Sequence, residues 1–271
     1  MNMKNKLANC TRNCTALLAA NFYNFETLKG LVLAAKATDS SIILQLSESS
    51  LEYLSIAPAV SMARVMLNEY DVQGWIHLDH GSNITLVKKC LDAGFDSVMI
   101  DASEKPLKEN IQITKEVVKL AEAYNASVEA ELGYIAKLGQ EQEAEPTNAT
   151  DAAYFVNETG VDALAIAIGN AHGFYKQIPK IRLDRLKEIR AVTNCALVLH
   201  GSSGIPDEQL KAAIKAGINK INLATETKNT FMKKLQQLLA NTDEIDLRKI
   251  FPKAIDDVVQ LISKKLNTIN G

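Results

Sequence analysis

Eight short, apolar segments rich in β-branched residues alternate with longer, charged, amphipathic segments along most of this 271-residue chain. Strands that are apolar on both faces are typical of a parallel sheet covered by helices, and the amphipathic segments would supply those helices. Several of these segments end in glycine, as helices commonly do. The expected strands are residues 15–22, 41–47, 74–80, 97–101, 127–133, 163–169, 196–201 and 218–225.

Eight strand–helix repeats in a chain of this length predict a (β/α)8 TIM barrel, α/β in class, as one domain over residues 1–271. An open, doubly wound sheet shows the same alternation, so the number of repeats alone does not decide between the two folds. The polar clusters favour the barrel, because nearly all of them follow directly after an apolar segment. Barrel active sites are built at the carboxyl ends of the strands.

Histidine is concentrated at these expected strand ends. The chain has four histidines, and three of them, His80, His172 and His200, lie in HLDHGS, IGNAHGFYK and LVLHGSSG. Imidazole suits zinc, and a catalytic zinc site typically has three protein ligands and one open position. The three histidines therefore indicate a metal site. His77 lies three residues before His80, so strand alternation should turn it away from that site, and we expect it to be structural.

Charge and hydropathy exclude several kinds of partner. A net charge of −2 gives no general attraction to nucleic acid or to an anionic membrane, so an anionic substrate must be held by local groups. No apolar run approaches the roughly 18 residues of a membrane span, and the amino terminus lacks the apolar stretch of a signal peptide. We expect a cytoplasmic protein with reduced, unpaired cysteines that binds a small molecule, neither nucleic acid nor membrane.

Six motifs, in the order HLDHGS, SVMIDAS, SVEAELG, AIAIGNAHGFYK, LVLHGSSGIP and KINLATE, resemble those of class II, zinc-dependent ketose-bisphosphate aldolases. This family includes fructose- and tagatose-bisphosphate aldolases, and the resemblance covers most of the chain. It implies an aldehyde-lyase that reversibly cleaves a phosphorylated ketose to dihydroxyacetone phosphate and an aldehyde. Ala224 stands where fructose-type members usually have an acidic or amide residue, so the chain is more similar to the tagatose branch.

The resemblance also implies roles for single residues. It assigns Zn2+ to His80, His172 and His200, and proton transfer at the C4 hydroxyl to Asp79, for which orienting an imidazole is the alternative. Asp101 and Glu131 are similar to further carboxylates near the metal, which could hold a second ion, form an alternative zinc position or make structural hydrogen bonds. The residues that match substrate-contacting positions are Asn21, Ser47, Gly173, Lys176, Gly201, Ser203, Asn222, Ala224 and Thr225.

Relatives imply two further partners. The carbonyls of Gly173 and Gly201 match groups that bind a monovalent cation, Na+ or K+. Family members form homodimers or homotetramers, so the resemblance implies a homo-oligomer here. Lys176 is a candidate phosphate ligand, although most lysines are solvated surface groups.

The segment 134–150 has no apolar periodicity and is expected to form a long loop after the fifth strand, of the kind that often serves as a lid. In the family a glutamate on this loop transfers a proton at the enediolate carbon. The chain departs from the usual Gly-Gly-x-Glu-Asp pattern and has LGQEQE after an apparent two-residue insertion. Glu141 is the best match and Glu143 the second, while a solvated acidic loop is the alternative.

Two other functions stay open at this point. One is an aldolase for a modified sugar, such as a deoxy or sulfonated ketose phosphate, because the loop is unusual and Glu104 stands where many members have histidine. The other is a barrel that binds zinc or sugar phosphate without catalysis. A zinc hydrolase is less consistent with the sequence, because the HxH strand motif common in hydrolytic barrels is absent.

Overall fold

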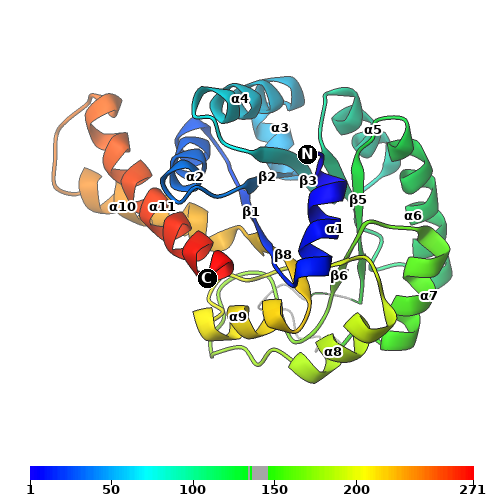
Figure 1. The fold of residues 1–271 in the computed structure, drawn as a ribbon. Coiled ribbons are helices and arrows are strands. Elements are labelled where there is room, and N and C mark those ends of the chain that lie inside the picture. Colours follow the sequence, from blue (N-terminus) through cyan, green and yellow to red (C-terminus); the bar gives the residue numbers. More distant parts are fainter. Residues whose placement is uncertain (134, 136–145) are drawn as a thin grey trace.

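The structure, a computed structural model, describes residues 1–133, 135 and 146–271. Eight parallel strands form a closed barrel in which each strand pairs with the next and the eighth pairs with the first (Figure 1). The strands are β1 (Leu17–Asn21), β2 (Ile42–Ser47), β3 (Gly74–Gly81), β4 (Ser97–Ile100), β5 (Ser127–Leu132), β6 (Ala163–Ile166), β7 (Ala196–Leu199) and β8 (Ile218–Leu223). The predicted TIM barrel is confirmed. All strands lie within their expected segments except β3, which runs one residue further.

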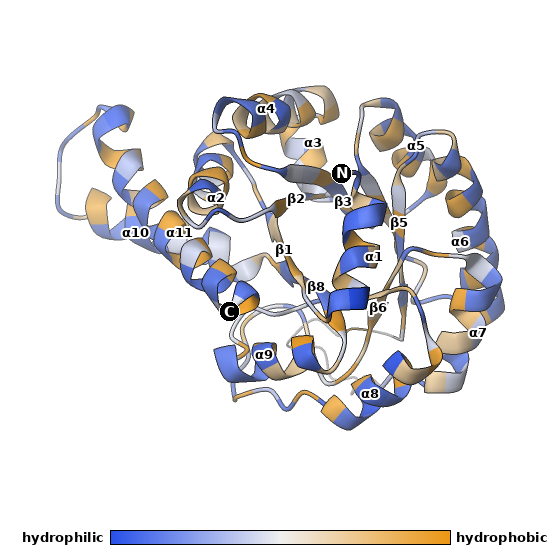
Figure 2. Cartoon of the chain, viewed as in Figure 1, coloured by the Kyte–Doolittle hydropathy of each residue, from blue (hydrophilic) through white to orange (hydrophobic). Residues whose placement is uncertain are grey.

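Amphipathic helices cover the outside of the barrel, and each carries both hydrophobic and hydrophilic residues (Figure 2). They are α2 (Phe25–Ala37), α3 (Glu48–Leu54), α4 (Ile56–Glu69), α5 (Ile84–Asp92), α6 (Leu107–Glu122), α7 (Ala149–Thr159), α8 (Leu183–Val192), α9 (Asp207–Lys215), α10 (Thr225–Leu239) and α11 (Leu247–Asn270). Helix α11 packs closely against α2, because Gly30 leaves room for Val258 where a Cβ would lie 2.6 Å from Val258 Cγ1. Helices α10 and α11 extend to one side of the barrel (Figure 1).

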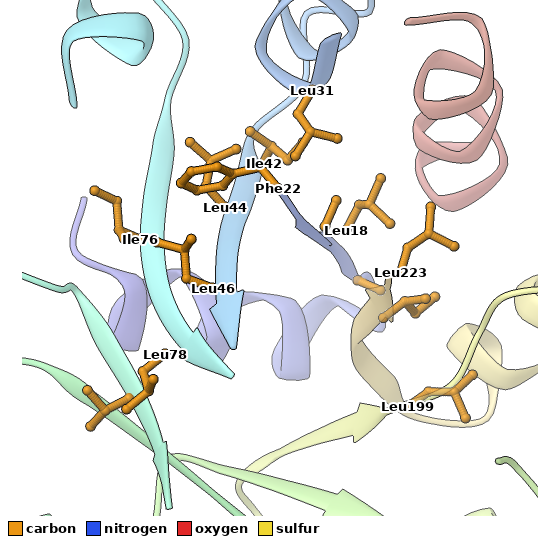
Figure 3. Close-up of a cluster of buried hydrophobic side chains, with 14 of the residues drawn as sticks. Leu18, Phe22, Leu31, Ile42, Leu44, Leu46, Ile76, Leu78, Leu199 and Leu223 are labelled. Atoms are coloured by element: carbon orange, nitrogen blue, oxygen red, sulfur yellow. The ribbon is translucent and has the colours of Figure 1, made fainter. Parts of the chain in front are cut away.

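The main hydrophobic core lies between the strands and this helical layer. Outward-facing strand residues such as Leu18, Leu44 and Leu78 are fully or almost fully buried in it (Figure 3). Because neighbouring side chains of a strand point to opposite faces, the alternate residues fill the inside of the barrel. Both faces of each strand are therefore buried, which explains the continuous apolar runs in the sequence.

The amino-terminal end of the barrel is closed by α1 (Met3–Asn13). Met3, Leu7 and Cys10 are buried against the first inward-facing strand residues, among them Leu17 and Trp75, in a second apolar cluster. No helix was predicted here, because only these three side chains mark the buried face of an otherwise polar segment. This apolar floor leaves the opposite end of the barrel for chemistry.

Three other expectations from the sequence concern the cysteines, membrane spans and the segment 134–150. The cysteines are free thiols, as expected. Within the described part of the chain, no helix has the length and apolar character needed to cross a membrane. Most of the proposed lid, including Glu141 and Glu143, lies outside the described residues, and the last two residues of that segment already belong to α7.

The closure of the barrel floor can be tested by truncating one side chain of α1. Leu7 is 1% exposed, so Leu7→Ala should lower the free energy of unfolding by about 2–5 kcal/mol through lost burial and a new cavity. Leu247→Ala, the same change at a side chain that is 61% exposed, should alter it by less than about 0.5 kcal/mol. Urea unfolding measures both values. Equal, small losses would mean that α1 does not contribute to the barrel core.

Candidate active site

A pocket lies at the carboxyl-terminal end of the barrel, opposite α1. Its walls come from the ends of β1, β3 and β8, from the loops after β6 and β7, and from the start of α10. The lining residues are Asn21, Asp79, His80, His172, Gly173, His200, Gly201, Ser203, Asn222, Ala224 and Thr225. Each of them was named from the sequence as a candidate site residue, so sequence positions up to 204 residues apart meet in one place.

The three predicted histidines converge with Glu131. One ligand atom from each of His80, Glu131, His172 and His200 can be chosen so that all four lie within 4.8 Å of one another. His80 Nε2 and His200 Nδ1 are 3.0 Å apart, and the ring centroids of His80 and His172 are 5.0 Å apart. Glu131 Oε2 is buried without a hydrogen-bond partner among the described residues. Three imidazoles and one carboxylate at this spacing fit a divalent metal of the zinc type.

The backbone of β3 turns His80 toward this cluster. In a regular strand His80 would face away from its neighbour Asp79, which points into the barrel. Instead His80 has a φ of 53°, and the pairing of β3 with β4 shifts register between Leu78 and Gly81. Such a left-handed residue costs on the order of 1–3 kcal/mol and is characteristic of functional sites. Gly81 is required next to it, since a Cβ there would lie 2.7 Å from Met99 O.

The loops after β6 and β7 are tied together, which brings His172 to His200. Tyr175 Oη accepts the Ala171 N–H (2.8 Å) and donates to Gly201 O (2.9 Å). Asn170 Nδ2 also donates to His200 O at 3.1 Å. Gly201 has a φ of 63°, and any Cβ there would collide with the Ala171 carbonyl. Close approach of the two loops therefore demands glycine at this position.

Asp79 is held beside the cluster by two amides. Asn21 Nδ2 donates to Asp79 Oδ2 at 2.9 Å, and Asn222 Nδ2 donates to Oδ1 at 3.3 Å. Gln45 in turn donates to Asn21 Oδ1 at 3.0 Å and orients that side chain. Burial opposes ionisation, but His80, His200 and the other neighbours outweigh it and lower the pKa of Asp79. An ionised carboxylate facing the pocket can accept a proton.

Asp101 contacts the cluster from outside it. Its Oδ2 lies 2.6 Å from His80 Nδ1, an arrangement that leaves His80 Nε2 to face the other histidines. Burial alone would lower the pKa of His80, but Asp79, Asp101 and Glu131 together raise it to about 9. Burial raises the pKa of Glu131 to about 8, with Asp101 adding to the effect. Both shifts show that carboxylates and imidazoles are crowded together in a buried place.

Several predicted site residues lie elsewhere. Ser47 ends β2 and caps α3, where its hydroxyl accepts the Ser50 N–H at 3.4 Å. Lys176 is exposed and is not among the described residues that line the pocket. His77 is not a member of the four-residue group that could hold a metal ion, and it lies fully buried inside the barrel.

Two functional candidates were missed from the sequence. Glu129 lies on β5 two residues before Glu131, and Lys220 lies on β8 two residues before Asn222. Both are almost completely buried inside the barrel, where Lys220 Nζ is 2.7 Å from Glu129 Oε2. Their signal was present, because a charged residue two positions from a site residue on a strand shares its inward face.

The chain is similar in sequence and fold to known proteins. The class-II fructose-bisphosphate aldolase family model matches residues 1–271. A fructose-bisphosphate aldolase from Geobacillus stearothermophilus is 38% identical over 278 residues, which covers 98% of this chain and 95% of the relative. A 6-phospho-5-dehydro-2-deoxy-D-gluconate aldolase from Shouchella clausii is 42% identical over 225 residues, or 81% of this chain and 77% of that protein.

The crystal structure of the YdjI aldolase from Escherichia coli K12 superposes with a TM-score of 0.87 and 30% identity, covering 99% of this chain and 96% of that one. The family match extends over the whole chain, including the strand ends that bear the three histidines. The chain belongs to the class-II fructose-bisphosphate aldolase family and is an aldehyde-lyase.

Proposed function

We propose that this protein is a zinc-dependent aldolase that reversibly cleaves a ketose 1,6-bisphosphate of the fructose or tagatose type to dihydroxyacetone phosphate and an aldehyde. The observation that carries the proposal is the cluster of three imidazoles and Glu131 with Asp79 beside it in the same pocket. Cleavage of a C–C bond next to a ketone leaves negative charge on an enediolate oxygen. When bound by His80, His172 and His200, Zn2+ supplies the Lewis acid that stabilises this charge.

Asp79 is proposed to handle the first proton. It accepts the proton of the C4 hydroxyl, the C4–O bond becomes the aldehyde carbonyl, and the electrons of the C3–C4 bond pass into the enediolate. The amides of Asn21 and Asn222 hold the carboxylate in place during this transfer. In the reverse direction Asp79 returns the proton to the new hydroxyl. Glu141, which follows β5 in the sequence and lies outside the described residues, is the proposed acid that protonates the enediolate carbon.

The start of α10 and the loop after β7 are proposed to bind the phosphate of the dihydroxyacetone phosphate half. Ser203 and Gly201 line the pocket together with Ala224 and Thr225, which begin a helix of 15 residues. Backbone N–H groups at the start of a helix attract phosphate. Such a local anion site is required because the chain, with a net charge of −2, has no general attraction for an anionic substrate. Na+ or K+ at the carbonyls of Gly173 and Gly201 is a further part of the proposal.

A second candidate substrate is 6-phospho-5-dehydro-2-deoxy-D-gluconate. The supporting observation is the 42% identity to an aldolase of that name. The zinc-loaded protein should be incubated with this compound and with fructose and tagatose 1,6-bisphosphates while dihydroxyacetone phosphate release is followed. Release from either bisphosphate supports the first candidate, and release from the deoxygluconate alone supports the second. No release from any of the three would favour a barrel that binds sugar phosphate without cleaving it.

Metal binding should depend on the histidine cluster. His172→Ala removes a proposed ligand, so its zinc affinity should fall by more than the roughly 10- to 100-fold that loss of a ligand's hydrogen-bond partner costs. His77→Gln changes the histidine outside the metal-ligating group and should retain about the wild-type zinc content. Metal analysis after dialysis against a chelator measures both. Full occupancy in His172→Ala, or its loss in His77→Gln alone, would contradict the assignment.

Turnover should depend on Asp79, whereas metal binding should not. Asp79→Ala removes the proposed proton acceptor and should lower kcat by a factor on the order of 10² to 10⁴. Its zinc content should stay near that of the wild type, because the carboxylate is outside the ligand group. Steady-state kinetics on zinc-loaded protein provides the test. An unchanged kcat would exclude the proposed role.

Glu141 should control exchange of the dihydroxyacetone phosphate C–H with deuterated solvent. Glu141→Gln should abolish this exchange, whereas Asp79→Ala should retain much of it, because the Asp79 proton belongs to the aldehyde half. NMR of dihydroxyacetone phosphate in deuterated buffer follows the reaction. Glu143→Gln is the matched control two residues away. Exchange lost in Glu143→Gln but normal in Glu141→Gln would assign the role to Glu143.

A further inference from the structure

A second polar layer lies inside the barrel directly beneath the histidine cluster. It contains Ser97, His77, Lys220 and Glu129, each at most 1% exposed. The contacts run in sequence from His77 Nδ1 to Ser97 Oγ (2.8 Å), from Lys220 Nζ to His77 Nε2 (3.3 Å) and from Lys220 Nζ to Glu129 Oε2 (2.7 Å). The other oxygen of Glu129, Oε1, lies 2.8 Å from His200 Nε2. The layer therefore ends on a proposed metal ligand.

We propose that the Glu129–Lys220 pair is a positioning device that fixes the tautomer of His200 and directs its Nδ1 lone pair at the metal site. A neutral imidazole has one N–H and one acceptor nitrogen. A carboxylate only accepts, so the Nε2 facing Glu129 carries the proton and Nδ1 is left bare. Nδ1 lies 3.0 Å from His80 Nε2 and 3.9 Å from Glu131 Oε2, within the ligand group. The inference rests on the metal site of the proposed function.

One neighbour acts in the opposite direction. Asn222 Nδ2 is a donor that lies 3.1 Å from His200 Nε2, and an N–H directed there would favour a bare Nε2. The same amide has Asp79 Oδ1 as an alternative acceptor at 3.3 Å. The contact with Glu129 is shorter and involves a charged acceptor, and such hydrogen bonds are roughly twice as strong as neutral ones. Glu129 therefore determines the tautomer.

Lys220 explains how a carboxylate is kept at this depth. An unpaired buried charge is strongly destabilising, whereas a close partner offsets much of the desolvation cost. The ammonium group only donates, so it holds Glu129 Oε2 and leaves Oε1 for His200. It also donates to His77 Nε2, which places the His77 proton on Nδ1 toward Ser97. His77 therefore serves the pair as a hydrogen-bond acceptor, a role that the amide oxygen of the His77→Gln control also fills.

Replacement of Glu129 by glutamine tests its positioning role separately from its packing role, because glutamine has nearly the same size and shape. An amide has one accepting oxygen and one donating nitrogen. Because Lys220 can only donate, the oxygen of Glu129→Gln should turn to Lys220 and the NH2 should face His200 Nε2. His200 must then accept at Nε2 and carry its proton on Nδ1, where it blocks the metal. Zinc affinity should fall about 10- to 100-fold.

Adding Lys220→Met to Glu129→Gln provides a rescue. Without the ammonium group the amide is free to turn its oxygen to His200, so the double variant should recover most of the lost zinc affinity. Ser127→Ala is the matched control, because Ser127 is buried on the same inward face of β5 and no polar partner engages its hydroxyl in the described structure. This control should bind zinc as tightly as the wild type.

Zinc affinity is measured by competition with a chelator, and the tautomer by ¹⁵N NMR of histidine-labelled protein before and after zinc addition. In the wild type, His200 should be protonated on Nε2 and should bind zinc through Nδ1. Binding through Nε2, wild-type affinity in Glu129→Gln, absence of rescue, or an equal loss in Ser127→Ala would each overturn the inference. If Glu129→Gln does not fold, the wild-type spectrum alone decides. Failure of the wild type to bind zinc would instead contradict the proposed function.

Discussion

Closure of eight parallel strands into a barrel is the constraint on which the site depends. Closure brings all the carboxyl ends to one rim, so residues far apart in sequence, such as Asn21 and Asn222, contact the same carboxylate. It also creates an enclosed interior whose two ends differ. Apolar side chains and α1 fill the amino-terminal end, while polar and charged side chains fill the end near the pocket. The pocket thus lies at the polar end of the barrel, and the apolar cluster closes the opposite end.

Burial of the polar interior affects the protonation of His200. His200 is fully buried, and burial together with His80 and its other neighbours lowers its pKa well below the usual value. A ring that stays neutral is a ready metal ligand, provided that the correct nitrogen is bare. The pairing of Glu129 with Lys220 supplies that condition at the cost of burying two charges. Stability and metal binding are therefore coupled through one ion pair.

Much of the architecture could be predicted from the sequence, because burial on both faces leaves a continuous apolar run for every strand. The ends of those runs also located the pocket, since polar residues there cannot be part of the core. The left-handed backbone of His80 could not be predicted, because strand alternation places its side chain outward and only the register shift reverses it. Glu129 and Lys220 were overlooked because they lie within the apolar strand segments, whereas site residues were sought at the ends of those segments. The roles proposed for residues 141 and 143 lie outside the described part of the chain.

We propose that His80, His172 and His200 hold a single zinc ion, with Glu131 at the same point and Asp79 beside it. X-ray diffraction from crystals of the zinc-loaded protein, recorded on both sides of the zinc absorption edge, tests it most directly. We expect one strong anomalous peak among His80 Nε2, His200 Nδ1 and the His172 ring, with metal–nitrogen distances of about 2.0–2.1 Å. A peak elsewhere in the molecule, or coordination through His200 Nε2, would contradict it.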